Sequence, residues 1–295
     1  MLIDLRLHLI TLVAVFLALA VGIAVGSTFL AGSSVERQVA RGLEREFGKL
    51  RKENETQKAA ISEITERLKQ TSEFGDIAVP VIVQGRLSHR RMAIIQTGDY
   101  PEAVQNAVSA LEYAGAQVVS ITTISNIESA DFNDRVLQAA KNISGGKAKD
   151  PQSVILKAVA ESIALSPDEG YMGMLEQKGI ISRSGFYLRR AGSIVLVGGS
   201  KEGGSRRTNL LLVEKLKAAG ATNIVGVEQC DAAVSYIVDY QREGISTVDH
   251  IDLPMGQVSL VFAMSGEAGN YGVRRSADRL LPAYLESAEW QKTFR

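Results

Sequence analysis

A glycine-rich segment is the first candidate for ligand chemistry. "GGSKEGGS", residues 198–205, lies between a stretch typical of a strand and one typical of a helix. Backbone N–H groups at such a junction can bind a phosphate, because they point at the ligand and the helix dipole favours negative charge there. The segment departs from the P-loop pattern, since Gly204 stands where the lysine belongs, and it lacks GxGxxG. We expect either a weak anion or nucleotide site or a flexible surface loop, and the candidate residues are Gly198, Gly199, Gly203, Gly204 and Ser205.

A methionine pair is the second candidate, for a soft metal. In "YMGM", Met172 and Met174 are two residues apart, and thioether sulfurs are ligands that Cu(I) prefers. Two sulfurs do not complete a site, and the other methionines, the histidines and the cysteine are remote in sequence. The alternative, which we favour, is that both methionines fill gaps in a hydrophobic core. Met172 and Met174 are therefore weak metal candidates.

The sequence shows no recognisable catalytic arrangement. His250 lies between Asp249 and Asp252, but no GxSxG motif accompanies it, and Cys230 has no motif partner. A single cysteine also excludes an internal disulfide and a cysteine-based zinc site. The 33 basic and 33 acidic residues balance, which argues against nucleic acid as a partner. We predict a protein that is not an enzyme and that has no firmly bound cofactor.

An apolar segment predicts a transmembrane anchor over residues 9–32. From Leu9 through Val35 no side chain is ionisable, and the apolar run is long enough to cross a hydrocarbon core of about 30 Å. The core of a cleaved signal peptide is shorter, about 7 to 15 residues. A cleaved signal is the alternative, because Ala24 and Gly26 are small residues at the two positions that a signal peptidase inspects. The length favours an anchor that is retained.

Small residues recur at every fourth position of this segment. That spacing places them along one face of a helix, where two backbones can approach closely in lipid. The pattern predicts a dimerisation face in the membrane; chance is the alternative, because glycine is frequent in membrane helices. The residues of the membrane dimer face are Ala14, Ala18, Gly22 and Gly26.

Residues 33–75 are polar overall with apolar residues at heptad spacing, which predicts a coiled-coil stalk. One asparagine at position a, here Asn54, is a usual device for fixing a parallel two-stranded register. In that register Glu46 meets Arg51 of a second copy, and the two charges are opposite. A helix lying on its own domain, or a charged linker, is the alternative. Two anchors in one bilayer emerge side by side, so anchor and stalk both predict a parallel homodimer or higher homo-oligomer. The predicted coiled-coil core is Leu43, Phe47, Leu50, Asn54, Ile61, Ile64 and Leu68.

Residues 76–295 predict an α/β domain. Two segments share the layout of strand, glycine-ended turn, helix, Ala-Gly-Ala and strand, which is a β-α-β unit. They look like an internal repeat, which favours a parallel, doubly wound sheet. The two units span residues 90–124 and 192–229; the other expected elements are helices at 130–143, 151–165 and 254–266, a strand at 245–253 and a terminal helix at 276–287.

The order of anchor, stalk and α/β domain, together with three segments, resembles the copper transport outer membrane protein (MctB) family. The segments are "LRLHLITLVAVFLALAVGIAVGSTF", then "SIVLVGG" followed by "AGATNIVGVEQ", and finally "VDHIDLPMGQVSLVFAMSGEAGNYGVRRSADRLLP". The resemblance spans nearly the whole chain. It implies a bacterial cell-envelope protein tied to copper homeostasis, which keeps internal copper low. It brings no copper-ligand motif to particular residues, so copper is a ligand suggested by the resemblance alone.

Charge and resemblance disagree about which side of the membrane the large domain faces. On the amino side of the predicted anchor only Arg6 is basic, and the positive-inside rule then places the domain in the cytoplasm. The family name suggests the opposite side, and long domains cross a membrane largely regardless of charge. We expect the extracytoplasmic side. The basic residues within about 20 positions after the anchor are Arg37, Arg41, Arg45, Lys49, Arg51 and Lys52.

The sequence thus predicts a single-pass, self-associating membrane protein of the bacterial cell envelope, with copper transport or homeostasis implied by the resemblance. The alternative is a non-enzymatic envelope scaffold or binding module whose α/β domain recognises a protein or a small anionic ligand. In both, the expected partners are the lipid bilayer, further copies of the chain and other envelope proteins.

Overall fold

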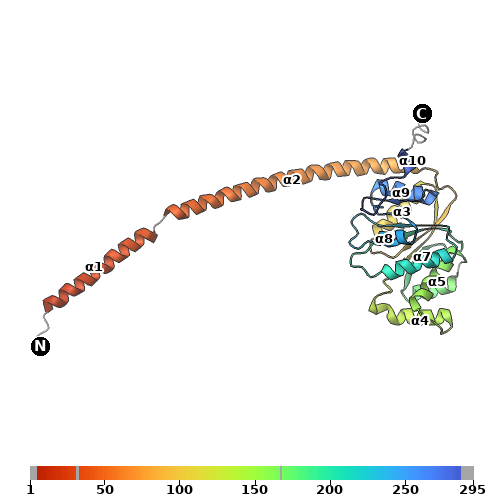
Figure 1. Cartoon of the computed structure of the whole chain (residues 1–295), viewed down its shortest axis with the longest axis horizontal. Coiled ribbons are helices and arrows are strands. Elements are labelled where there is room, and N and C mark those ends of the chain that lie inside the picture. The colour runs from red at the N-terminus through yellow and green to blue at the C-terminus, as the bar shows by residue number, and fades with distance from the viewer. Residues whose placement is uncertain (1–4, 31–32, 167, 287–295) are drawn as a thin grey trace. The chain divides into compact units, whose positions relative to one another are not determined.

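The computed structural model describes residues 5–30, 33–166 and 168–286 (Figure 1). The chain divides into two units, Met1–Lys69 and Gln70–Arg295. The first contains helix α1, Leu5–Leu30, and most of helix α2, Ser33–Val83. The second contains the end of α2, the sheet and the remaining helices.

From Leu9 to Val25, helix α1 is apolar or small on all sides. Among the described residues it holds the one segment long and apolar enough to cross a membrane, His8–Thr28, and none of that segment is buried inside the chain. A helix that is apolar all round needs an apolar environment. An apolar helix long enough to cross a membrane is what the sequence predicts for residues 9–32.

The sheet has seven strands in the order β3-β2-β1-β4-β5-β6-β7. Neighbouring strands are parallel, except that β3 runs antiparallel to β2 at one edge. Strands β1 and β4 are neighbours at the centre of the sheet. From β1 the chain continues outward to β2, and from β4 it continues outward in the opposite direction to β5. The strands are β1 Arg91–Gln96, β2 Gln117–Ile124, β3 Ile181–Gly185, β4 Ser193–Val197, β5 Asn223–Val227, β6 Ser246–Val248 and β7 Asn270–Tyr271.

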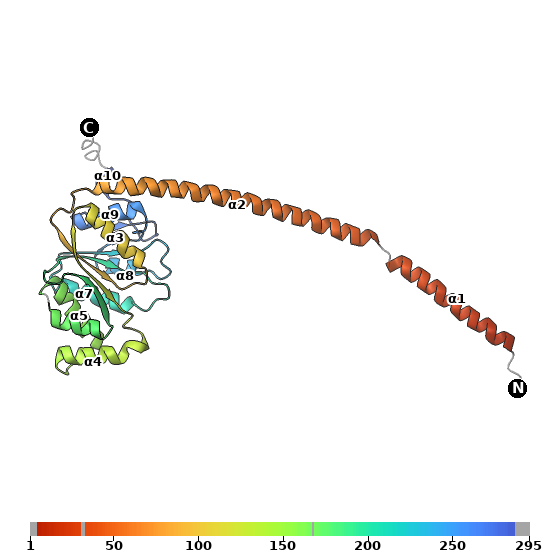
Figure 2. The ribbon, with the colours of Figure 1, turned by 180° about the vertical axis from the view of Figure 1, so that it is seen from behind.

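Helices cover both faces of the sheet (Figures 1 and 2). Helices α3 and α9 and the end of α2 pack on one face, and helices α4 to α8 pack on the other. The helices are α3 Pro101–Tyr113, α4 Asn133–Ser144, α5 Pro151–Ala164, α6 Glu169–Gln177, α7 Arg206–Ala218, α8 Ile237–Arg242, α9 Pro254–Ser265 and α10 Ala283–Glu286, with a short 3₁₀ turn at Ala130–Phe132.

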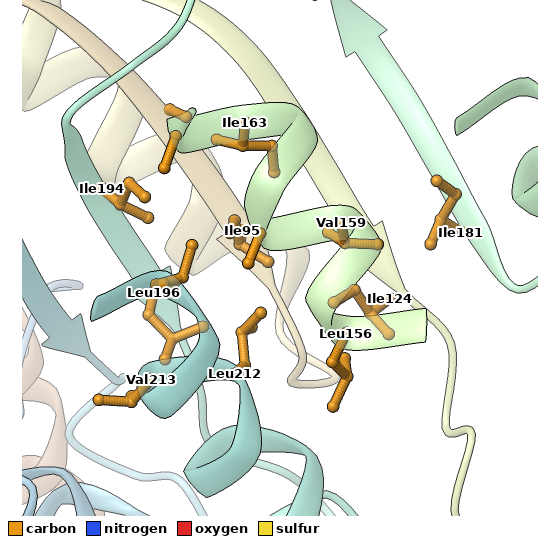
Figure 3. Packing of buried hydrophobic residues seen from close by; sticks show 14 of the residues in the cluster. Ile95, Ile124, Leu156, Val159, Ile163, Ile181, Ile194, Leu196, Leu212 and Val213 are labelled. Atoms are coloured by element: carbon orange, nitrogen blue, oxygen red, sulfur yellow. The ribbon is translucent and has the colours of Figure 1, made fainter. Parts of the chain in front are cut away.

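Strand β1 shows why the sheet has two buried faces. Side chains alternate along a strand, so Met92 and Ile94 enter the core under α3 and α9, while Ala93 and Ile95 enter the core under α5 and α7. All four are fully buried. Figure 3 shows the second of these cores, with Ile95 beside side chains of α5 and α7. A strand buried on both faces reads as a continuous apolar run, which is what "MAII" is.

The last turns of α2 belong to the core of the second unit. Val79 and Val83 are buried in the same apolar cluster as α3 and α9. A side chain on Gly75 would overlap the ring of Pro254 at the start of α9. Glycine lets the backbone of α2 come this close to α9.

Both predicted β-α-β units are confirmed, with α3 between the parallel strands β1 and β2 and α7 between the parallel strands β4 and β5. Strands β3 and β7 and helices α6 and α8 were not predicted from the sequence. The strand expected at 245–253 corresponds to β6, which is shorter than predicted because the chain leaves the sheet after Val248. The prediction of a terminal helix at 276–287 was wrong for most of these residues. Helix begins only at Ala283, since Pro282 disfavours the helical conformation at the residue before it; residue 287 lies outside the described residues.

Candidate functional site

The parallel strands end at one edge of the sheet, and the residues that follow them are the first place to look for a site. Thr97 follows β1, Gly198 follows β4, Glu228 follows β5 and Asp249 follows β6. In open α/β sheets ligands bind at this carboxyl edge, where the strand order reverses. Here that point lies between β1 and β4.

Hydrogen bonds close the junction between β1 and β4. The N–H of Gly98 donates to the carbonyl of Val197 at 3.3 Å, and the N–H of Asp99 donates to the carbonyl of Gly199 at 3.2 Å. A side chain on Gly98 would overlap that Gly199 carbonyl oxygen. The two segments therefore stay in contact beyond the ends of their strands.

The glycine-rich loop at residues 198–205 is held by the chain's own side chains. Backbone N–H groups of Lys201, Gly203 and Ser205 donate to side-chain oxygens at distances of 3.1, 2.9 and 3.3 Å. Three of its glycines have positive φ, which only glycine adopts readily. The glycines thus serve a turn whose donors bond within the chain, and the turn residues with positive φ are Gly199, Gly203 and Gly204.

The amino end of α7, which follows this loop, carries an internal carboxylate. Oε1 of Glu128 accepts hydrogen bonds from the N–H of Thr208 at 2.7 Å and from its hydroxyl at 2.8 Å. Arg206 and Arg207 each form an ion pair with an aspartate at 2.6 Å. A bound phosphate would compete with these carboxylates, so the predicted anion site at Gly198, Gly199, Gly203, Gly204 and Ser205 receives no added support from its surroundings.

The two methionines of the predicted soft-metal pair point to different places. Met172 is fully buried in the core under α5, while Met174 is partly buried and accepts a long hydrogen bond from Asn142 at 3.6 Å. Residues two apart on a helix point about 200° apart around its axis. The sulfurs of Met172 and Met174 therefore do not converge, and the packing of Met172 is that of a core residue.

A buried carboxyl at the end of β5 was missed by the sequence analysis. Glu228 is fully buried; its Oε1 accepts a hydrogen bond from the N–H of Tyr236 at 2.7 Å, and its Oε2 has no hydrogen-bond partner among the described residues. Burial raises the pKa of Glu228 to about 7, although the Ser235 hydroxyl and the Tyr236 N–H act to lower it. Burial, and then the charge of Glu228, raise the pKa of the nearby Tyr240 hydroxyl well above its usual value. The one signal in the sequence is an acidic residue directly after an apolar strand.

Asp249 and His250, singled out in the sequence, lie side by side after β6 and are buried. Burial acts to raise the pKa of Asp249, but the His250 ring and the N–H groups of Val273 and Arg274 together lower it. Those N–H groups donate to Asp249 at 2.9 and 3.0 Å. Nδ1 of His250 is 3.3 Å from Oδ1 of Asp249, a contact whose geometry is not that of a hydrogen bond. The carboxylate of Asp249 thus ties the residues after β7 to the end of β6.

Cys230 is bound to Asp252 through two contacts. Oδ1 of Asp252 accepts the N–H of Cys230 at 2.8 Å, and its Oδ2 accepts the thiol at 3.0 Å. Burial, together with this carboxylate, raises the pKa of the Cys230 thiol to about 11. A thiol that stays protonated is a poor metal ligand and a poor nucleophile, because both roles need the thiolate.

The predicted association faces lie on α1 and α2. Added side chains on Gly22 or Gly26 would meet no other atom within 4 Å. Ala18 and Gly22 line a shallow groove of about 480 Å³ on α1. On α2 the large apolar residues of the predicted seam are 53% to 68% exposed in the single chain: Leu43, Phe47, Leu50, Ile61, Ile64 and Leu68.

Comparison with known proteins identifies the family. The model of the family described as "Copper transport outer membrane protein, MctB" matches residues 2–282. This chain belongs to that family. Proteins named "Copper transporter MctB" from Mycobacterium bovis and from Mycobacterium tuberculosis are each 25% identical to this family member over 321 aligned positions, which cover 93% of this chain and 98% of the relative.

A metal centre built from histidine, cysteine and acidic side chains is absent from the described residues of this family member. Over residues 5–30, 33–166 and 168–286, no group of three or more histidine, cysteine or acidic side chains is placed to hold a metal ion. His250 is buried, the Cys230 thiol is bound to Asp252, and Met172 is in the core.

Proposed function

We propose that this chain is a single-pass, self-associating membrane protein of the bacterial cell envelope that takes part in copper transport or homeostasis. The observation that carries the proposal is the length of the family match, which runs from residue 2 to residue 282. The alignments with the relatives named as copper transporters likewise cover 93% of this chain and 98% of the relative, so the likeness is not confined to one part of the chain. No cofactor is part of the proposal, and copper is the cargo.

Each part of the chain has a role in this proposal. Helix α1 anchors the protein through the face formed by Ala14, Ala18, Gly22 and Gly26, and α2 forms a parallel coiled-coil stalk with a second copy. The stalk presents a doubly wound α/β domain on the extracytoplasmic side. A single helix per chain cannot enclose a path for an ion, so the path is formed by several chains or by another envelope protein.

The copper role is tested by removing the gene from its host and measuring copper per cell by mass spectrometry after growth in added copper. The proposal expects more internal copper without the protein, and restoration by the wild-type chain. A variant with Leu50→Asp and Ile61→Asp, which places charge in the predicted seam, should not restore the lower level. Lys52→Asp, at the outward heptad position f, is the matched control and should restore it. Unchanged copper after deletion would contradict the copper role.

Self-association is tested by oxidative cross-linking of a Leu50→Cys chain in membranes, with Cys230 replaced by serine. A coiled coil brings two copies of position d together, so a disulfide-linked dimer is expected. Lys52→Cys is the control and should cross-link far less. Monomer alone from the Leu50→Cys chain would exclude the parallel seam.

The side of the membrane is tested with the same Lys52→Cys chain in intact cells. A membrane-impermeant thiol reagent should label it if the domain is extracytoplasmic. Labelling only after lysis would place the domain in the cytoplasm and count heavily against export.

An envelope scaffold or binding module without a metal role is the second candidate, and the position of Met172 in the core favours it. The two candidates differ in a Cu(I) titration of the detergent-purified chain. Stoichiometric binding that is lost in Met172→Leu with Met174→Leu supports direct copper binding by the domain. The absence of binding supports the scaffold, or copper handling elsewhere in the assembly.

A further inference from the structure

A basic pocket lies at the amino edge of the sheet, opposite the carboxyl edge described above. Its volume is about 350 Å³, and four of the nine residues that line it are basic, namely His89, Arg90, Arg91 and Arg190. None of the residues that line it is acidic. The chain as a whole has zero net charge, so this pocket is a local concentration of positive charge.

The topology explains why cations from distant segments meet there. Because β3 is antiparallel to β2, it ends at the amino edge, where Gly185 pairs with Ser120. The next strand, β4, begins at Ser193 on the far side of β1. Residues 186–192 therefore cross the beginning of β1, and this crossing places Arg190 beside Arg91.

Most of the arginines in this region are available to a ligand. Arg90 is the exception, since its guanidinium donates to the carbonyl of Met264 at the end of α9 at 2.8 Å. The side chains of Arg91, Arg189 and Arg190 are exposed, and they make no hydrogen bond or ion pair within the described part of the chain. His89 adopts a φ of 64°, the only positive φ of a non-glycine residue over the described ranges. Strained backbone of this kind is often found at binding sites.

The crossing segment also carries the two most exposed large apolar side chains of the described residues. Phe186 is 79% exposed and Leu188 is 75% exposed. Tyr187 between them is buried, and its hydroxyl donates to the carbonyl of Ile121 at 2.8 Å. The N–H of Phe186 donates to the carbonyl of Val119 at 2.7 Å. The segment is thus fixed to β2, and it holds Phe186 and Leu188 toward solvent.

We propose that this surface, formed by His89, Arg91, Phe186, Leu188, Arg189 and Arg190, binds the headgroup region of an anionic phospholipid bilayer. Phosphate oxygens enter the basic pocket, where Arg91 and Arg190 bind them. Phe186 and Leu188 enter the boundary between headgroups and acyl chains. Amphipathic helices that lie in the membrane interface combine basic residues with Trp, Phe or Leu, and this non-helical segment combines the same kinds of residue. The inference goes beyond the proposed function, because it concerns a second membrane contact that is independent of α1 and of copper.

The full chain tests this proposal when it is reconstituted into phosphatidylcholine vesicles with the α/β domain outward. These vesicles are mixed with protein-free fluorescent vesicles of phosphatidylcholine with or without phosphatidylglycerol, and captured fluorescence is measured. Capture should require phosphatidylglycerol and fall as salt rises, because salt screens exposed charges. Arg189→Ala with Arg190→Ala should weaken binding about 30-fold, which corresponds to about 1 kcal/mol per arginine. Phe186→Ser with Leu188→Ser should also reduce capture.

A matched control removes two positive charges elsewhere. Lys147→Ala with Lys149→Ala changes exposed lysines that precede α5, whose other end lines the pocket, and it should leave capture unchanged. Equal loss in the lysine and arginine variants would overturn the proposal, and so would capture that ignores phosphatidylglycerol. Calorimetry with inorganic phosphate distinguishes the sources of the anion. Phosphate binding without vesicle capture, or no binding to either, would overturn a membrane contact.

Discussion

Replacing Glu228 with glutamine removes a buried acid while it preserves the shape of the side chain. In the wild-type chain Oε1 of Glu228 accepts the N–H of Tyr236, and the amide oxygen of glutamine can do the same. The other oxygen, Oε2, is buried without a hydrogen-bond partner among the described residues. The substitution therefore tests the electrostatic cost of burying Glu228 and changes little of the packing.

The pKa of Glu228 determines the sign and size of the effect. Burial raises this pKa from 4.5 to about 7. Between these values the native state keeps a proton that the unfolded chain releases. The carboxyl therefore favours the native state fully below pH 4.5, and that contribution is lost as the pH rises through about 7. One pKa unit corresponds to about 1.4 kcal/mol, so the whole shift is worth roughly 3 kcal/mol.

The expected result is a difference between wild type and Glu228→Gln that changes with pH. From about pH 4.5 to about pH 8, the unfolding free energy of the variant should rise by roughly 3 kcal/mol relative to wild type. Urea unfolding of residues 70–295, followed by circular dichroism at several pH values, measures it. Glu214→Gln, an exposed acid on α7, is the control and should give a flat difference. A flat difference for Glu228→Gln as well would refute the argument that burial raises this pKa.

Two further substitutions test the carboxyl edge. Gly198→Ala should destabilise the domain by about 1–3 kcal/mol in urea unfolding, because its Cβ would lie 2.5 Å from the hydroxyl of Tyr240; Gly173→Ala, in open space on α6, is the control and should be neutral or slightly stabilising. Glu128→Ala should cost about 1 kcal/mol because it removes the cap on Thr208 at the start of α7. An unchanged midpoint in either case would show that these contacts do not contribute to stability.

Hydrophobic patterning predicted the centre of the sheet because strands buried on both faces are continuous apolar runs. Strand β3 escaped notice for the opposite reason. It is an edge strand whose sequence is "ISRSG", and only its first residue is buried. Its Arg183 forms ion pairs with Glu169 and Glu176, so polar contacts rather than apolar burial hold it in place. Neither the alternation of apolar and polar residues nor the hydrophobicity of the segment distinguishes such a strand from a loop.

The candidate sites were harder to predict because their decisive contacts join residues far apart in sequence. From sequence alone, a glycine-rich turn before a helix is a reasonable prediction of an anion site. The structure shows that the carboxylate of Glu128, 80 positions before Thr208, already binds the start of that helix. The environment of Glu228 likewise depends on Tyr240 and on the turn at Gly198. Those neighbours come from separate elements, so the raised pKa of Glu228 follows from tertiary structure and not from the local sequence.

The end of the predicted stalk shows how one helix can serve two kinds of packing. The heptad register that places Ile61 and Leu68 at position a also places Gly75 at the next a position. In the structure the backbone at Gly75 lies against Pro254, and Val79 and Val83 complete the contact with the second core. A position that a coiled coil would offer to a second copy is therefore occupied by the chain's own domain. If α2 pairs with a second copy, the seam must end before Gly75, and from that point each helix is committed to its own α/β domain.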